Sequence, residues 1–156
     1  MRSLVARLTV SCVLFGTLFA TSKPSVPPPG KKVATGQFFE VYVSKAEEKP
    51  APAGYISRVF KVIVVAHTHK HGIQRFTMRM ETLDADLLEP KNWEIKDLDG
   101  DGMDDFRSLA QVTKKGCQVW PAQRWEKDRE RFTSGGPKLA RHVDASGKPV
   151  ANCVLR

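Results

Sequence analysis

Residues 97–105 read Asp-Leu-Asp-Gly-Asp-Gly-Met-Asp-Asp, and this stretch constrains the chain more than any other. Unneutralised carboxylates at this density repel one another in a compact fold, so the folded state is expected to hold a cation among them. A hard divalent ion takes about six to eight oxygen ligands, which alternate carboxylates and one backbone carbonyl can supply. A solvated acidic turn is the alternative. We predict that the loop binds Ca²⁺ through five residues, the carboxylates of Asp97, Asp99, Asp101 and Asp105 and the carbonyl of Met103.

The loop differs from an EF-hand in its second half. Counting from Asp97, the eighth position is Asp104 where an aliphatic residue is expected, and the twelfth is Ser108 in place of the bidentate Glu. Gly100 and Gly102 allow the sharp turns that wrapping an ion requires. A loop whose last carboxylate is Asp105 is typical of shorter calcium loops that lie between two strands. Its affinity should be modest, as suits a compartment rich in calcium.

Residues 1–22 have the features of an export signal. Arg2 and Arg7 are basic, residues 8–19 are apolar, and small residues precede Lys23. The apolar run is short for a membrane span, and no stop-transfer segment follows. We therefore expect a periplasmic or secreted protein whose mature chain has no transmembrane segment.

The mature chain keeps two cysteines, Cys117 and Cys153. An even pair in an oxidising compartment is expected to form a disulfide. Closing a loop of this length contributes roughly 4 kcal/mol to stability. Two buried thiols or a soft-metal pair are the alternatives.

The rest of the chain predicts a Pro-rich linker over 23–36 and one domain over 37–156. Residues 55–66 and 73–80 alternate in the manner of strands, and the polar residues 67–72 between them predict a hairpin. Residues 106–112 fit a strand better than a helix. The fold class is mainly β, a single antiparallel domain, sandwich-like or FG-GAP-like, with the Asp-rich loop between strands. The further expected strands are 38–43, 92–96, 117–125, 131–133, 139–143 and 150–155.

The basic excess is local. The chain carries a formal charge of +8, and residues 114–156 hold ten basic and four acidic residues. Such an excess favours an anionic partner, against the alternative of ordinary charge for solubility. Residues 124–132 place charges such as Lys127, Arg129 and Arg131 between two aromatics, which predicts a hairpin tip. Export makes nucleic acid a poor candidate for the partner.

His67, His69 and His71 alternate at the predicted hairpin turn. Imidazoles at this spacing can bind zinc, copper or nickel, and a metal-dependent hydrolase is then conceivable. A solvated polar turn explains them better. The sequence offers no catalytic motif, and carboxylates committed to a cation are poor acids or bases. We therefore expect a non-enzymatic, monomeric protein.

With its elements placed, the chain resembles periplasmic lysozyme-inhibitor-like β-proteins that carry an FG-GAP-type calcium loop. The resemblance covers about residues 55–135 and rests on the strand pair, on Ile73-Gln74-Arg75-Phe76, on the Asp-Gly loop and on Val119-Trp120. The resemblance implies that the chain inhibits a lysozyme. Some members of the group do so with a Ser-Gly-x-x-Tyr segment. Here Ser134-Gly135-Gly136-Pro137 lacks the Tyr, and a basic protein is repelled by basic lysozymes. A calcium-binding module for an anionic envelope component is therefore the first expectation, and inhibition the alternative.

Overall fold

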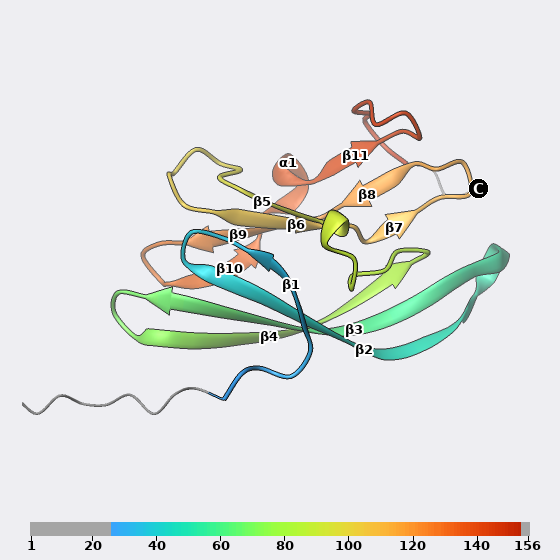
Figure 1. Ribbon diagram of the computed structural model, residues 1–156. Helices are drawn as coiled ribbons and strands as arrows, with labels where there is room; N and C mark the ends of the chain where they lie inside the picture. The colour runs from blue at the N-terminus through green and yellow to red at the C-terminus, as the bar shows by residue number, and fades with distance from the viewer. Residues whose placement is uncertain (1–25, 154–156) are drawn as a thin grey trace, which may run out of the picture.

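The computed structural model describes residues 26–153, and these form a mainly β domain of two sheets with short helical turns (Figure 1). The predicted export signal and the first residues of the predicted linker lie outside the described residues. Within residues 26–153, no helix has the length and apolar character needed to cross a bilayer.

The larger sheet has seven strands in the order β1-β2-β3-β4-β7-β8-β11. All neighbours are antiparallel except β4 and β7, which meet in parallel at a single pair, Leu83 and Gln111. The long β3 is central, as its two apolar faces predict, and it pairs with β2 on one side and β4 on the other. The strands are β1 (Lys31–Thr35), β2 (Phe39–Ala51), β3 (Tyr55–Thr68), β4 (Gly72–Leu83), β7 (Gln111–Val112), β8 (Gln118–Trp120) and β11 (Arg141–Val143).

The smaller sheet packs on one face of the larger sheet. Its order is β10-β9-β6-β5, and its strands are β5 (Trp93–Lys96), β6 (Asp105–Ser108), β9 (Ala122–Glu126) and β10 (Arg131–Ser134). Three short helices, η1 (Pro52–Gly54), η2 (Pro90–Asn92) and α1 (Gly136–Leu139), connect the strands.

The main core lies between the two sheets. Alternate residues of β2 and β3 face the smaller sheet, and Phe60, Val62 and Val64 are fully buried there. Phe76, Met78 and Met80 of β4 pack against the same core, which confirms the alternation predicted for that strand. The smaller sheet contributes an aromatic group, Trp93, Phe106, Trp125 and Phe132.

Several predicted boundaries were wrong at prolines. The strand expected over 38–43 continues as β2 through Pro50, because β1 covers only its first residues and leaves Pro50 on an open edge that requires no N–H. The segment expected as one strand over 117–125 divides at Pro121, where the chain passes from the larger sheet to the smaller one. Within the predicted linker, Lys31–Thr35 forms β1 and pairs with β2.

The C-terminal third also differs from the expectation. Leu139 ends a helical turn, so the strand there begins at Arg141. A strand was expected over 150–155, but the described part of this segment, residues 150–153, forms no strand. The turn around Gly147 contributes only a bridge between Val143 and Pro149. Residues 106–112 form strands rather than a helix, although β6 and β7 belong to different sheets.

The predicted disulfide is present between Cys117 and Cys153, whose Cα atoms lie 5.7 Å apart. It joins the turn before β8 to the C-terminal segment. A smaller core lies nearby, beneath β7, β8 and β11, and consists of Ala85, Leu109, Trp120 and Val143.

Candidate metal centre

The acidic loop is the tip of a hairpin between β5 and β6. Lys96 ends β5 opposite Asp105, which begins β6, so the intervening residues are held at both ends by one strand pair. The loop thus lies between two strands, as expected from its spacing. Gly100 and Gly102 have φ values of 82° and 85°, which an L residue adopts only with strain, so the two glycines are required where the backbone turns.

Three of the predicted ligands converge. One carboxylate oxygen from each of Asp97, Asp99 and Asp105 lies within 4.8 Å of the others, so this group could hold a metal ion. Asp101 does not belong to this close group. Its Oδ1 accepts a hydrogen bond from the Met103 N–H at 2.8 Å. The Met103 side chain packs against the core, and ligation by its carbonyl stays a prediction.

The backbone of the loop already organises these carboxylates. Asp97 accepts hydrogen bonds from the N–H groups of Gly100 at 2.7 Å and Gly102 at 2.9 Å. The Gly102 N–H is the main cause of a lowered Asp97 pKa. Asp99 accepts one from the Asp101 N–H at 3.2 Å. The loop therefore favours an ionised Asp97, which is the form that binds a cation.

Asp105 is the one fully buried carboxylate of the group. Burial raises its pKa, an effect opposed by the N–H groups of Trp125 and Leu98, and the charges of Asp99 and Asp101 raise it further. Its two oxygens accept hydrogen bonds from Trp125 at 2.8 Å and Leu98 at 3.0 Å. Asp105 thus ties the loop to β9, and a cation beside it would offset the cost of burying its charge.

Asp104, which was not predicted as a ligand, has a different role. Its Oδ2 accepts a hydrogen bond from the Gln37 N–H at 2.7 Å, in the turn between β1 and β2. The loop is therefore attached to both sheets. No local signal in the sequence indicates this contact, because the two residues are far apart in the chain.

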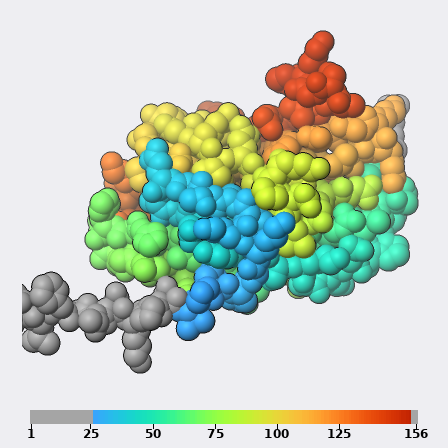
Figure 2. Space-filling model, viewed as in Figure 1, coloured from blue at the N-terminus to red at the C-terminus, as the bar shows by residue number. Residues whose placement is uncertain are grey.

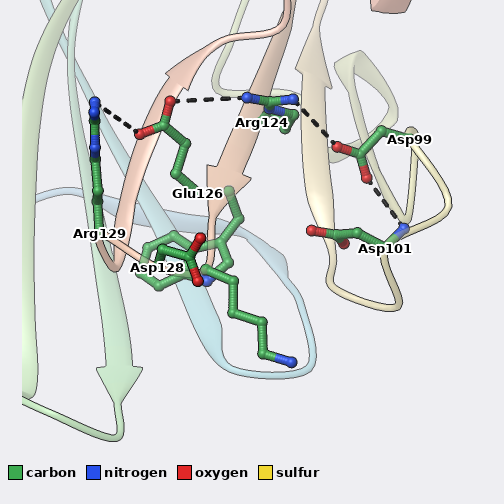
Figure 3. Close-up of a pocket in the computed structure, with 8 residues that line it drawn as sticks. Asp99, Asp101, Arg124, Glu126, Asp128 and Arg129 are labelled. Atoms are coloured by element: carbon green, nitrogen blue, oxygen red, sulfur yellow. Dashed lines mark hydrogen bonds and ion pairs between the residues drawn. The ribbon is translucent and has the colours of Figure 1, made fainter.

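A shallow cleft of about 460 Å³ lies beside the loop and the β9–β10 hairpin. Figure 3 shows Arg124 between two carboxylates, 3.7 Å from Asp99 and 3.7 Å from Glu126. Lys127 and Arg129 also line the cleft. Sequence reasoning missed Arg124 as a neighbour of the loop, since only the register of the smaller sheet brings them together.

The hairpin tip predicted over residues 124–132 is confirmed, with Trp125 opposite Phe132. Much of its positive charge is locally neutralised. Glu126 lies within 4 Å of the side chains of Arg124, Arg129 and Arg131, and Arg131 lowers its pKa most. Lys127 has no carboxylate partner within the part of the chain described, so its charge is available to a ligand.

The three histidines do not converge on a metal site. His67 is exposed on β3, and His69 and His71 occupy the β3–β4 turn, so the predicted hairpin is confirmed. Glu130 stabilises this turn by accepting hydrogen bonds from the N–H groups of His69 and Lys70 at 3.0 and 3.1 Å. Among residues 26–153, the aspartate group is the only close cluster of three potential metal ligands.

The segment 134–137, considered above for lysozyme inhibition, is not a projecting loop. Ser134 ends β10, Gly136 begins the helical turn α1, and Gly135 packs so closely on Ala122 that an added Cβ would lie 2.9 Å from the Ala122 Cβ. Comparison with known proteins finds no matching family model, no similar curated protein and no similar solved structure. The likeness to lysozyme-inhibitor-like proteins therefore stays a prediction from the sequence.

Proposed function

We propose that this chain is an exported, non-enzymatic binding module that calcium stabilises and that recognises an anionic component of the bacterial envelope. The convergence of Asp97, Asp99 and Asp105 at the β5–β6 tip carries the proposal. A hard, oxygen-only donor set of this kind suits Ca²⁺ rather than a soft transition metal. The disulfide fits an oxidising compartment such as the periplasm.

The cleft beside the loop supports an anionic ligand. Its lining includes three basic side chains, those of Arg124, Lys127 and Arg129, and four carboxylates. A divalent cation in the adjacent loop would neutralise part of this negative charge and leave the three basic side chains better able to bind an anion. We therefore expect anion binding to depend on calcium. Catalysis is not part of the proposal, because the loop carboxylates are committed to backbone N–H groups and to the cation.

The test uses the mature, disulfide-bonded chain and vesicles of phosphatidylglycerol or of phosphatidylcholine. Sedimentation with the vesicles is measured in calcium and in chelator, at low and at moderate salt. We expect binding to the anionic vesicles only, in calcium only, and weaker as salt screens the exposed charges. Two matched variants separate the β9–β10 hairpin beside the cleft from general charge. Lys127→Gln/Arg129→Gln/Arg131→Gln should lose binding, and Lys45→Gln/Lys49→Gln/Lys61→Gln should keep it.

Lysozyme inhibition is the competing outcome. Stoichiometric inhibition of a lysozyme at moderate salt, unchanged by the first triple substitution, would overturn the proposal. So would equal sedimentation with both kinds of vesicle. Zinc that co-purified with the protein and was released by His69→Ala would instead indicate a metal-dependent enzyme.

A further inference from the structure

Strand β4 has an open edge. It pairs with β3 along its whole length, but on its other side it meets β7 only at Leu83. Within the described chain, residues 73–82 of β4 therefore have no neighbouring strand on their outer side. Alternate residues of a strand direct their N–H and C=O groups to each side, so this edge presents unsatisfied groups that can pair with another strand. In Figure 1, β4 lies at the margin of the larger sheet.

A groove of about 570 Å³ runs along this edge, between β4 and the smaller sheet. Its floor is apolar, formed by half-buried Phe76, Met78 and Met80 and by Phe132 of β10. The ring centroids of Phe76 and Phe132 lie 5.9 Å apart. β10 is itself the last strand of the smaller sheet, so both sheets end on this side. In Figure 2 the green surface of this region is exposed at one end of the molecule.

Two charges on the outer face of β4 lack a charged partner. Arg75 donates to the Val26 carbonyl, and Glu81 accepts a hydrogen bond from the Ser57 hydroxyl at 2.5 Å. Neither forms an ion pair within residues 26–153, whereas Arg79 lies 3.6 Å from Glu47. Arg75 and Glu81 are of opposite sign and equally distant from Met78 along the strand.

We propose that β4 pairs with β4 of a second copy of this chain, antiparallel and about a two-fold axis at Met78. This register places Arg75 opposite Glu81 of the second copy, and the symmetry forms that pair twice. Phe76 then lies opposite Met80 on the apolar face. The unpaired N–H and C=O groups of each β4 edge then form hydrogen bonds with those of the other copy, and the larger sheets of the two copies become continuous. A dimer replaces the monomer expected from the sequence.

Neighbouring registers lack this complementarity. An axis at Thr77 places Arg75 opposite Arg79, which is a repulsive pair. An axis at Arg79 places that residue opposite itself. Since directly opposed like charges destabilise a strand pair and opposite charges stabilise it, the sequence of β4 favours the axis at Met78 over both of these neighbouring registers. The contact uses no residue of the 97–105 loop, so the dimer is independent of the proposed calcium binding.

Analytical ultracentrifugation of the mature chain over a wide concentration range tests the proposal. The wild type should dimerise, and Arg75→Glu should weaken the dimer by about tenfold or more because both charge pairs become repulsive. The charge-swapped variant Arg75→Glu/Glu81→Arg should restore the wild-type dissociation constant. Lys61→Glu, a charge reversal on the neighbouring strand β3, should leave it unchanged. Circular dichroism melts of each variant establish that it is folded.

Hydrogen exchange supplies a second measurement that does not depend on substitutions. Outward-facing amides between Gln74 and Glu81 should become protected as the protein concentration rises. A protein that stays monomeric at every concentration would overturn the proposal, as would a dimer insensitive to Arg75→Glu. Capture of an unrelated extended peptide by a monomeric β4 edge would equally overturn it.

Discussion

The replacement Asp105→Asn tests the candidate metal centre most directly, because Asp105 is buried and has two separable roles. Its oxygens accept hydrogen bonds from the N–H groups of Trp125 and Leu98, and one of them faces Asp97 and Asp99. Asparagine keeps the shape but turns an NH₂ group toward one of the two donors. A buried backbone N–H left without an acceptor costs about 1–3 kcal/mol. Removing a buried charge offsets part of this loss, so in chelator the variant should be destabilised by no more than that range.

Calcium should enlarge the difference in the free energy of unfolding between the wild type and Asp105→Asn. At a free concentration about 100 times Kd, calcium adds about 2.7 kcal/mol to the free energy of unfolding of the wild type. Asp105→Asn lacks one charged ligand and should gain much less, so in calcium the free energies of unfolding of the two proteins should differ by up to about 6 kcal/mol. Urea unfolding of both proteins, with calcium and with chelator, gives all four values.

Asp104→Asn is the matched control. Asp104 accepts its hydrogen bond from Gln37 and lies outside the close carboxylate group, so this variant should keep the full calcium increment. An equal calcium increment in the wild type and in Asp105→Asn would refute the reasoning. So would the absence of any increment in the wild type.

Three further predictions concern other parts of the fold. Arg124→Gln should tighten calcium binding by up to about fivefold in calorimetry, since it removes a positive charge from the edge of the carboxylate group; weaker binding would show that Arg124 instead orders the loop. Serine at both Cys117 and Cys153 should lower the free energy of unfolding by roughly 4 kcal/mol in urea melts, from a sequence separation of 36. The pKa of Asp84 is lowered chiefly by the Ile56 N–H, so its ionised form stabilises the fold above about pH 4 and that stability is lost as the pH falls through the folded pKa. Asp84→Asn should therefore show a flatter loss of stability than the wild type between about pH 4 and pH 2 in urea melts.

The parts of this fold that follow from local pattern were predictable from the sequence. The period-two alternation of residues 73–80 predicts a strand with one buried face, and Phe76 and Met78 lie on that face. The Asp-Gly spacing predicts the turns of the loop, because the conformations at Gly100 and Gly102 depend mainly on neighbouring residues.

What the sequence could not supply depends on contacts between distant segments. Asp105 and Asp101 look equivalent in the loop, yet the first is buried against β9 and the second is exposed at the tip. Arg124 reaches Asp99 only because β6 and β9 pair in one particular register. The edge strand β1 was not predicted, because it lies in the segment interpreted as a Pro-rich linker. Its pairing with β2, rather than the pattern of its own residues, makes it a strand.

The position of the loop gives the proposed cation a consequence for ligand binding. Asp105 holds β9 through Trp125, and Arg124, the preceding residue of β9, lines the cleft. If calcium raises the affinity of the cleft for an anion by some factor, the anion must raise the affinity for calcium by the same factor. Calcium titrations with and without anionic vesicles should therefore give the same ratio of dissociation constants as vesicle titrations with and without calcium. Since this equality holds for any two linked sites, salt must distinguish the possible causes of the linkage. If calcium acts on the anion only through long-range charge, the ratio of dissociation constants should fall to one at moderate salt. If the ligand is bound in the cleft, the ratio should stay above one.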